Sequence, residues 1–494
     1  MRNPPSHNFA AQLVARFSGN SSLVEAASGS TLGAAEVRTQ IAGFAMWFLA
    51  AGLRPGDRVL LRCGINSATA LAYLGAMYAG IVPVLLDERT HAASGNSVNA
   101  KVGAKAVWSA KSMRQDWAMQ AGVPILEGGC SPLDPTSVQP YSARKGDLAA
   151  LMPTSGSTGT PRFVEVSHGN LIANTEAIIR SQRLGVDEKA MLIMPISYCF
   201  GASVLHTHLY RGGSVVFDAR FMFPDKVLHA INGYGCTTFA GVPTVYNILL
   251  RRSSLRAMTF PTLRRFLQAG GGLAPQNVEE MRTIVPSADF FVMYGQTEAT
   301  ARISCLPPDR IGDKIGSAGV ALDNLRLRIV DDEEQDVPQG NVGHILVAGP
   351  SICEGYFGDP EASQEKFSNG WLHTGDVGLL DKDGYLWIQG RTSDFVKIRG
   401  YRVGLADVEA RVAAVAGVSE CAATGIPHPE AGEALAIFVV ADETSAHNNR
   451  TSSVTDRVRQ ALPAQWTCSL VKLVSELPRT GNGKIARSQL QELA

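Results

Sequence analysis

The chain has 494 residues, and its 45 Lys and Arg residues balance 45 Asp and Glu residues, so the formal net charge is zero. A chain without net positive charge has no long-range electrostatic field that attracts a polyanion, which argues against nucleic acid as a principal partner. The eight cysteines contain no CxxC pair, which excludes a disulfide framework and a zinc knuckle, and the N-terminus lacks the apolar core of a signal peptide. We therefore expect a cytoplasmic globular protein of two to four domains.

Short β-branched runs alternate with helical stretches, which is typical of α/β domains with largely parallel sheets. The clearest strands are predicted at residues 58–62, 214–218, 237–240 and 289–293. The longest uncharged run, residues 63–86, resembles a membrane span, but Asn66, Gly75, Gly80 and Pro83 interrupt it. We predict instead a buried helix at 68–79 followed by a strand at 81–86, and no membrane span.

A loop of small and hydroxylated residues follows a short apolar strand in the segment LMPTSGSTGTPRFVEVSHG, residues 151–169. Glycines let backbone amides approach an anion closely, and hydroxyl groups add further donors, so the loop suits a polyphosphate. It is not a Walker A loop, because no Gly-Lys-Ser/Thr opens a helix after it. Apolar strands flank it on both sides, which argues against a flexible linker. The candidate phosphate-binding residues are Thr154, Ser155, Gly156, Ser157, Thr158, Gly159, Thr160 and Arg162.

The segment MYGQTEAT, residues 293–300, directly follows an apolar strand. Ligands of open α/β sheets bind at the carboxyl ends of the strands. At such an edge Tyr294 can stack on a base, Thr297 can contact a phosphate and Glu298 can hold a magnesium ion. By itself the motif would more often be an ordinary strand-to-loop exit than a nucleotide site.

From about residue 326 the sequence becomes rich in strands, with a tight hairpin turn predicted at Asp383-Gly384. Within this region GWLHTGD presents Asp376 in a glycine-flanked turn, and Arg391 follows fifteen residues later. Such an Asp can accept both hydroxyls of a ribose, and the Arg can reach phosphate or ribose oxygens. His373 is expected to pack in the turn, since no second metal ligand accompanies it.

The chain after Arg391 reads as a small α+β domain, with an amphipathic helix at 405–414, strands near residue 420 and at 434–440, and a polar stretch at 442–454. Near its end LPRTGNGK forms a glycine-rich turn that presents Lys484. A flexible ammonium group can neutralise charge that develops between a carboxylate and a phosphate.

Taken in order, TSGSTGTPR, YGQTE, GWLHTGD, GRTSDFVKIRGYRV and PRTGNGK closely resemble the motifs of the adenylate-forming superfamily, which comprises acyl-CoA synthetases, peptide-synthetase adenylation domains and luciferases. GLRPGDRVLL, from residue 52, is also typical. The resemblance implies a large N-terminal α/β domain of mixed sheets with helices and a small β part, residues 1–392. It also implies a small mobile α+β domain, residues 393–494, that rotates between two half-reactions.

The resemblance also implies roles for individual residues. Residues 154–160 would cradle the ATP phosphates, and Lys484 would bridge the carboxylate and the phosphate. Thr297 would contact the α-phosphate, Glu298 the magnesium ion, and Asp376 and Arg391 the ribose. Adenine would be bordered by Ala269, Gly270, Gly271, Gly272, Tyr294 and Gly295, and the acceptor would reach the site past Gly400.

Three positions depart from the family pattern. Arg162-Phe163 stands where Lys-Gly is common, which keeps the charge but changes its geometry. Ser393 and Asp394 occupy the usual hinge, so the position of the pivot is open. Gly201 follows Phe200 where α-amino-acid-activating domains carry an Asp, which argues against an α-amino acid substrate.

The acid-binding wall would come from PISYCFGASVLH, residues 195–206, whose surface is mostly apolar. An apolar aliphatic, cyclic or aromatic carboxylic acid fits it best. The expected contacts are Tyr198, Phe200, Gly201 and Val204. His206 would contact a polar substituent or, as we favour, serve as a buried structural histidine.

We therefore predict an ATP- and Mg²⁺-dependent ligase that activates a carboxylic acid as acyl-AMP with release of pyrophosphate. The acyl group would pass to a thiol, either coenzyme A or the phosphopantetheine of a carrier protein. Two alternatives stay open. One is transfer to an amino-acid amine, as in coronafacate ligases, and the other is a non-catalytic nucleotide-binding scaffold, suggested by Arg162 and Ser393.

Overall fold

A computed structural model describes residues 7–111, 123–128, 138–154, 161–398, 401–441, 451–463, 466–478, 485 and 487–494. The chain divides into two compact units. The larger unit holds the described residues up to Thr374 together with Leu379–Ile388, and the smaller unit holds Gly375–Gly378 and the described residues from Gln389 onward. The predicted functional boundary after residue 392 stays a prediction.

A nine-stranded sheet forms the centre of the larger unit, in the order β15-β14-β13-β12-β11-β9-β10-β1-β2. Its strands from β13 to β1 run parallel, and β2, β14 and β15 are antiparallel additions at the two edges. The bounds are Ser22–Glu25 (β1), Thr31–Gly33 (β2), Lys189–Leu192 (β9), Ser214–Phe217 (β10), Thr238–Gly241 (β11), Arg265–Gln268 (β12), Asp289–Tyr294 (β13), Ser304–Leu306 (β14) and Val320–Ala321 (β15).

A six-stranded sheet, ordered β6-β5-β3-β4-β7-β8, is parallel except for its last pair. Its strands are Arg58–Cys63 (β3), Val82–Asp87 (β4), Ala106–Ser109 (β5), Ile125–Glu127 (β6), Leu148–Pro153 (β7) and Phe163–Ser167 (β8). A third sheet of five strands consists of Arg326–Val330 (β16), Gly343–Ala348 (β17), Phe367–Ser368 (β18), Trp371–Leu380 (β19) and Leu386–Arg391 (β20). These sheets confirm the predicted mixed-sheet α/β class and the strand-rich segment after residue 326.

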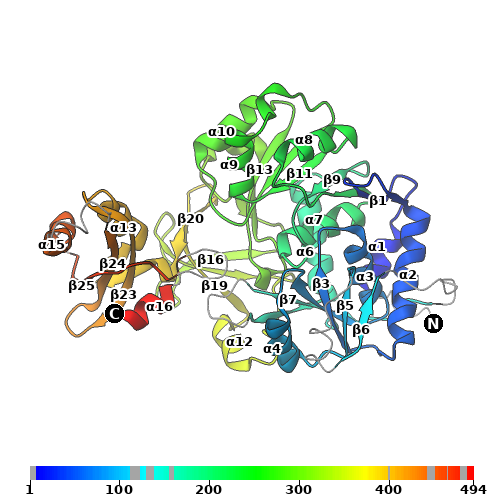
Figure 1. The fold of residues 1–494 in the computed structure, drawn as a ribbon, viewed down its shortest axis with the longest axis horizontal. Helices are drawn as coiled ribbons and strands as arrows, with labels where there is room; N and C mark the ends of the chain where they lie inside the picture. The colour runs from blue at the N-terminus through cyan, green and yellow to red at the C-terminus, as the bar shows by residue number, and fades with distance from the viewer. Residues whose placement is uncertain are drawn as a thin grey trace. The chain divides into compact units, whose positions relative to one another are not determined.

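Helices cover both faces of the nine-stranded sheet, with α8, α9 and α10 on one face and α6 and α7 on the other (Figure 1). The helices of the larger unit are Phe9–Ala15 (α1), Ala34–Ala50 (α2), Ser67–Tyr78 (α3), Ala92–Val102 (α4), His168–Ser181 (α6), Cys199–Tyr210 (α7), Pro224–Gly233 (α8), Pro243–Arg252 (α9), Pro275–Ile284 (α10), Ile311–Lys314 (α11) and Pro360–Lys366 (α12). Single 3-10 turns occur at Leu255–Ala257 (η2), Thr297–Ala299 (η3), Pro308–Arg310 (η4) and Thr392–Asp394 (η5). α3 and β4 confirm that the long uncharged run splits into a helix and a strand, and none of the described helices is long and apolar enough to cross a membrane.

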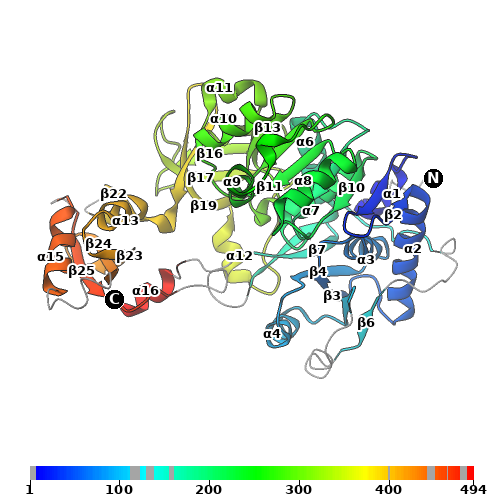
Figure 2. The same ribbon diagram turned by 45° about the horizontal axis from the view of Figure 1, so that its top comes forward.

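The short helix α1 is fixed into the larger unit by polar and aromatic contacts from distant parts of the chain; Figures 1 and 2 show it beside α2 and α3. The Asn8 side chain caps α1 and donates to the carbonyl oxygens of Met77 and Tyr141. The backbone N–H of Phe9 donates to His168 Nδ1 (3.1 Å), and the Phe9 ring packs edge-on against His206. All of these partners lie at least 69 residues away along the sequence, so α1 connects segments that are distant in the chain.

The smaller unit is an α+β domain, as predicted. Its sheet contains Phe395–Ile398 (β21), Tyr401–Gly404 (β22), Val418–His428 (β23), Gly432–Ala441 (β24) and Cys468–Leu473 (β25). Its helices are Leu405–Ala413 (α13), Thr451–Ala461 (α15) and Arg487–Leu493 (α16). Val396, Leu405, Val408 and Leu435 belong to a buried core of this unit's own. Most of the predicted polar stretch at 442–454 lies outside the described residues.

Candidate active site

The predicted phosphate loop lies at the tip of a hairpin. β7 and β8 run antiparallel with Pro153 opposite Phe163, and the backbone N–H of Thr154 donates to the carbonyl oxygen of Arg162 (2.9 Å). The six residues between Thr154 and Pro161, namely Ser155, Gly156, Ser157, Thr158, Gly159 and Thr160, lie outside the described part of the chain. Both ends of the loop are therefore fixed by the sheet.

Arg162 leaves this hairpin toward two residues of a later segment. Its Nε lies 3.2 Å from Asp359 Oδ2, and its guanidinium carbon lies 5.6 Å from the centre of the Tyr356 ring. The arginine side chain is half exposed, so the ion pair itself adds little stability. The contacts of Arg162 connect the β7–β8 hairpin with the segment of Tyr356 and Asp359, in which Tyr356 contacts Glu298.

Glu298 is buried in the 3-10 turn η3, just after the carboxyl end of β13. The Tyr356 hydroxyl donates a hydrogen bond of 2.6 Å to its Oε1. Burial, followed by the charge of Glu298, raises the pKa of Tyr356 well above its usual range, so the phenol remains a donor. Glu298 forms no ion pair with any residue that the structure describes. A buried carboxylate without a cation is costly, and at this edge of the sheet it can receive one.

The backbone around Glu298 is held in an unusual conformation. Thr300 has φ +67° and ψ −45°, and Ala301 N–H bonds to the carbonyl oxygen of Ala299, which makes Thr300 the centre of a γ-turn with positive φ. A β-branched residue is strained there. The Thr300 hydroxyl donates to the Ser351 carbonyl oxygen (2.6 Å), and Cys353 N–H donates to the Glu298 carbonyl oxygen (3.0 Å). These bonds hold the turn against its strain.

Gly295, next to Tyr294, lies where two backbone segments cross. A Cβ at this position would stand 1.8 Å from the carbonyl oxygen of Ala301, so only glycine fits. The half-buried Tyr294 is the last residue of β13, and its carbonyl oxygen accepts from Ile303 N–H (2.9 Å). The chain therefore turns back on itself immediately beside Thr297 and Glu298.

The predicted adenine wall, Ala269 to Gly272, follows β12. Because β12 and β13 are parallel neighbours, with Gln268 opposite Val292, this wall and Tyr294 share one edge of the sheet. Gly270 has φ +86°, and its missing side chain leaves room for the hydroxyl of Tyr198, which would lie 2.4 Å from a Cβ. The Gln268 side chain donates to the Gly271 carbonyl oxygen (2.8 Å), which fixes the turn. Gly270, Gly271 and Gly272 are exposed, as a ligand wall requires.

The predicted acid-binding residues come from the start of α7. Tyr198 is half-buried, and Phe200 and Val204 are buried, with the rings of Tyr198 and Phe200 packed edge to face. Gly201 allows the helix to approach residue 195, because a Cβ would lie 2.4 Å from the Pro195 carbonyl oxygen. Position 201 therefore has a packing reason to be glycine, independent of the substrate.

His206 lies one turn further along α7, inside the core. Its Nε2 shares a hydrogen bond with the Tyr73 hydroxyl (3.1 Å), and its ring stacks near that of Tyr73. Burial lowers the pKa of His206 to about 3, so the imidazole is neutral at physiological pH. These contacts agree with the structural reading of this histidine.

In the smaller unit, Arg391 Nε lies 3.6 Å from Oδ1 of the buried Asp376. The backbone N–H of Arg391, the N-cap of the single turn η5, donates to Oδ2 of Asp394 (3.0 Å), the last residue of that turn, which also contains Ser393. Two further residues of this unit, Gly400 and Lys484, lie outside the described residues.

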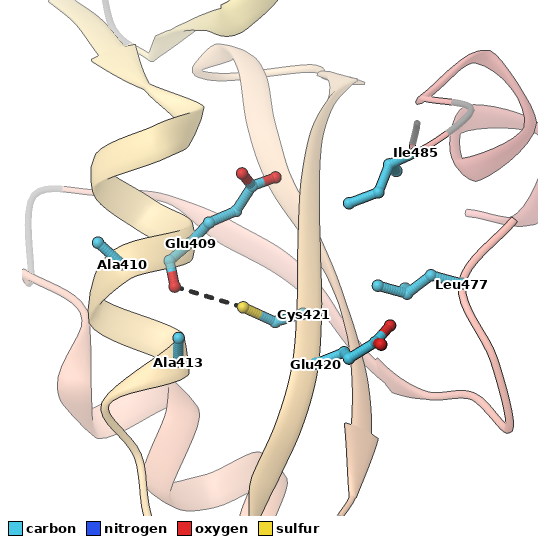
Figure 3. Close-up of a pocket in the computed structure, with 7 residues that line it drawn as sticks. All are labelled: Glu409, Ala410, Ala413, Glu420, Cys421, Leu477 and Ile485. Atoms are coloured by element: carbon cyan, nitrogen blue, oxygen red, sulfur yellow. Dashed lines mark hydrogen bonds between the residues drawn. The ribbon is translucent and has the colours of Figure 1, made fainter. Parts of the chain in front are cut away.

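The segment that carries Lys484 is anchored at both ends. Leu477 before it and Ile485 after it pack with Phe438 and Leu490 in one apolar cluster. Figure 3 shows Leu477 and Ile485 lining a pocket together with Glu409 and Cys421, whose thiol donates to the Glu409 carbonyl oxygen. Arg487 pairs with both carboxylate oxygens of Glu409 at 3.0 and 3.2 Å, which ties α16 to α13.

Comparison with known proteins decides the family. The profile of the AMP-binding enzymes matches residues 11–357, and that of the AMP-binding enzyme C-terminal domain matches residues 407–484. The chain belongs to the AMP-binding enzyme family. It is an adenylate-forming ligase of the acyl-CoA synthetase type, which confirms the predicted activity at the level of the class.

Among the relatives of this AMP-binding enzyme, a feruloyl-CoA synthase of Amycolatopsis sp. is 32% identical over 94% of both chains. A fatty acid–[acyl-carrier-protein] ligase of Streptomyces coeruleorubidus, ScoC, is 27% identical over 90% of this chain and 88% of its own length. The crystal structure of ATP-bound MatB from Rhodopseudomonas palustris superposes with a TM-score of 0.82 over 99% of both chains, at 27% identity.

Sequence reasoning missed three residues around this site. Tyr356 and Asp359 lie in GYFGDP, a glycine- and aromatic-rich loop whose pattern fits no strand or helix. Arg302, two residues beyond the strained turn, resembles any surface arginine in the sequence but is fully buried. An aromatic between glycines in a loop was the available signal for Tyr356, and nothing local distinguishes Arg302.

Proposed function

We propose that this enzyme activates a carboxylic acid by attack of its carboxylate on the α-phosphate of ATP, releasing pyrophosphate and forming acyl-AMP. The single observation that carries the proposal is the buried carboxylate of Glu298, oriented by Tyr356 at the edge of the sheet shared by Tyr294 and the glycine wall. Glu298 fits Mg²⁺, since that ion takes oxygen ligands and is typically held by one or two carboxylates together with substrate phosphates. When bound, the ion neutralises charge on the departing pyrophosphate.

The other predicted residues take roles that suit this chemistry. The loop 154–160, whose two ends are held by β7 and β8, would bind phosphate oxygens through its amides and hydroxyls, with Arg162 at its base. Thr297 would contact the α-phosphate. The exposed glycines 270–272 and Tyr294 would border adenine. Asp376 and Arg391 would bind the ribose, and Lys484 would neutralise charge between the attacking carboxylate and the α-phosphate. Charge neutralisation and in-line positioning carry such a displacement, so no nucleophilic side chain is needed.

The test is pyrophosphate exchange into ATP, with a panel of carboxylic acids and full-length protein. We expect acid-dependent exchange that falls by at least about 100-fold in Lys484→Ala and in Glu298→Gln. Lys382→Ala and Glu279→Gln, which change exposed residues, should retain it. Tight ATP binding without exchange for any acid would instead favour a non-catalytic nucleotide scaffold.

We further propose that the acyl group passes to a thiol of coenzyme A or of a carrier-protein phosphopantetheine, in the cytoplasm where ATP and coenzyme A are supplied. Support comes from the likeness to a feruloyl-CoA synthase and to an acyl-carrier-protein ligase. One activated acid should be offered coenzyme A, a phosphopantetheinylated carrier and a mixture of amino acids in parallel, with products identified by mass. A thioester is expected, whereas an amide as the only product would contradict thiol transfer.

A further inference from the structure

Arg302 is the largest charged side chain in the core of the larger unit, with only 2% of its surface exposed. It lies between the γ-turn at Thr300 and strand β14. The Asn174 side chain of α6 holds its backbone from both sides, since Arg302 N–H donates to Asn174 Oδ1 (3.2 Å) and Asn174 Nδ2 donates to the Arg302 carbonyl oxygen (2.9 Å). The arginine is therefore placed by the fold.

The guanidinium group has no anionic partner among the residues that the structure describes. No carboxylate oxygen of these residues lies within ion-pair distance, and Nε is buried without a hydrogen bond. An arginine stays ionised in proteins, so burial of this kind is costly unless something else pairs with the charge.

The groups around Arg302 are neutral, and two of them, Phe200 and Tyr198, belong to the predicted acid-binding wall. Its guanidinium carbon lies 4.8 Å from the centre of the Phe200 ring. Burial raises the pKa of Tyr198 to about 12 and that of Cys305 to about 12, so both groups keep their protons. The cation–π contact offsets part of the cost of burial but leaves the buried Nε–H without a hydrogen-bond partner.

Burial raises the pKa of the Cys199 thiol, and both charges act on it as well: the charge of Arg302 lowers this pKa and that of Glu298 raises it. Yet Glu298 and Arg302 form no ion pair with each other. Two buried opposite charges that form no ion pair with each other are each available to a ligand. Glu298 fits the cation that accompanies ATP, which leaves Arg302 for an anion.

We propose that Arg302 binds a second carboxylate on the acid substrate, so that the preferred substrate is a dicarboxylic acid with an apolar or aromatic body. This inference rests on the proposed function. One carboxylate is adenylated near Thr297, and the other pairs with the planar guanidinium, whose N–H donors match a carboxylate in a two-point contact. Tyr198, Phe200 and Val204 contact the body between them. The predicted apolar wall is thus retained, with a charged residue at its inner end.

The experiment compares matched acids in pyrophosphate exchange: hexanoate with adipate, octanoate with suberate, and benzoate with terephthalate. We expect the wild type to prefer the dicarboxylate in at least one pair by about 100-fold in kcat/KM, because an analogue without the second carboxylate leaves a buried donor unpaired. Arg302→Met should reverse that preference, and Arg302→Lys should give an intermediate ratio. Arg180→Met, which removes an exposed arginine paired with Asp323, should leave the ratio unchanged.

The ratio between paired acids is the decisive readout, because a purely structural arginine would lower both members of a pair equally on replacement. An equal loss for both acids in Arg302→Met, or a wild type that prefers the monocarboxylate in every pair, would overturn the assignment, and the second result needs no folded variant. If none of the acids supports pyrophosphate exchange, the proposed function itself is overturned, and this inference falls with it.

Discussion

At the scale of single residues, the site is organised by buried polar groups that lack their usual partners. Among the residues that the structure describes, Glu298 has one hydroxyl donor and no cation, and Arg302 has an aromatic face and no anion. Such groups are destabilising in a free protein and become favourable when a ligand supplies the missing charge. Binding energy is thereby concentrated on the correct ligands.

Tyr356 is expected to act by orienting Glu298. Tyr356→Phe removes a hydrogen bond to a charged group, which typically contributes about 1.5–3 kcal/mol, so exchange activity should fall by at least about tenfold. Because the carboxylate would be less well placed for the metal, the Mg²⁺ concentration needed for half-maximal rate should rise. Tyr78→Phe, with no phenol hydrogen bond to a described residue, is the matched control. Unchanged Mg²⁺ dependence in Tyr356→Phe would contradict the positioning role.

At the scale of elements, strand ends and the loops after them carry the chemistry. The carboxyl ends of β12 and β13 present the glycine wall and Tyr294, and the hairpin of β7 and β8 presents the phosphate loop. In the smaller unit, α16 and the residues on either side of the Lys484 segment pack through Leu477, Ile485 and Leu490. A reactive residue on a glycine-rich turn needs such fixed ends, because the turn itself supplies no packing.

Leu490 tests this anchoring. Leu490→Ala creates a cavity at a fully buried position and should destabilise the smaller unit by about 2–5 kcal/mol. Exchange activity should fall as well, because the base of the lysine-bearing turn loses its packing. Leu493→Ala, on the same helix but 46% exposed, is the control and should change the unfolding free energy by less than about 0.5 kcal/mol. Denaturant unfolding and exchange rates at one temperature give both results; full activity in a destabilised Leu490→Ala would contradict the anchoring role.

The parts of the fold that local patterns encode were predictable. The helix and strand in residues 63–86, the strand preceding Tyr294 and the strand-rich region after residue 326 all appear where periodicity and turn residues place them. Contacts between distant segments were not predictable in this way. Tyr356 meets Glu298 across fifty-eight residues, and Arg302 is buried by α6 and α7. The local periodicity of a sequence carries no information about contacts between residues that lie so far apart in the chain.

At the scale of the whole molecule, the formal net charge is zero, and three buried histidines of the core stay unprotonated in the folded protein. His168, His206 and His208 are buried in the larger unit, and burial lowers their pKa values to about 4, 3 and 4. Unfolding exposes each imidazole, whose ordinary pKa is near 6.5. Between about pH 6.5 and pH 4 the unfolded chain therefore binds protons that the folded chain does not.

The contribution of these three histidines to the free energy of unfolding is therefore fully present above about pH 6.5 and is lost as the pH falls toward 4. Three such groups give a slope of up to about 4 kcal/mol per pH unit. His206→Gln should remove about one third of this slope, as measured by urea unfolding at intervals from pH 7.5 to 4.5. Above pH 7 the change in the free energy of unfolding of the same variant measures the packing cost alone, because the imidazole is then neutral in both states. An unaltered slope would show that His206 does not contribute.

The attachment of α1 also determines the order in which this protein can fold during synthesis. Asn8 and Phe9 emerge from the ribosome early, but their partners Tyr141, His168 and His206 follow more than a hundred residues later. At typical rates of about 5–20 residues per second, the last of these partners, His206, is made roughly ten seconds or longer after Phe9. Helix α1 can therefore meet α3 early, but it completes its set of contacts only after α7 has been made.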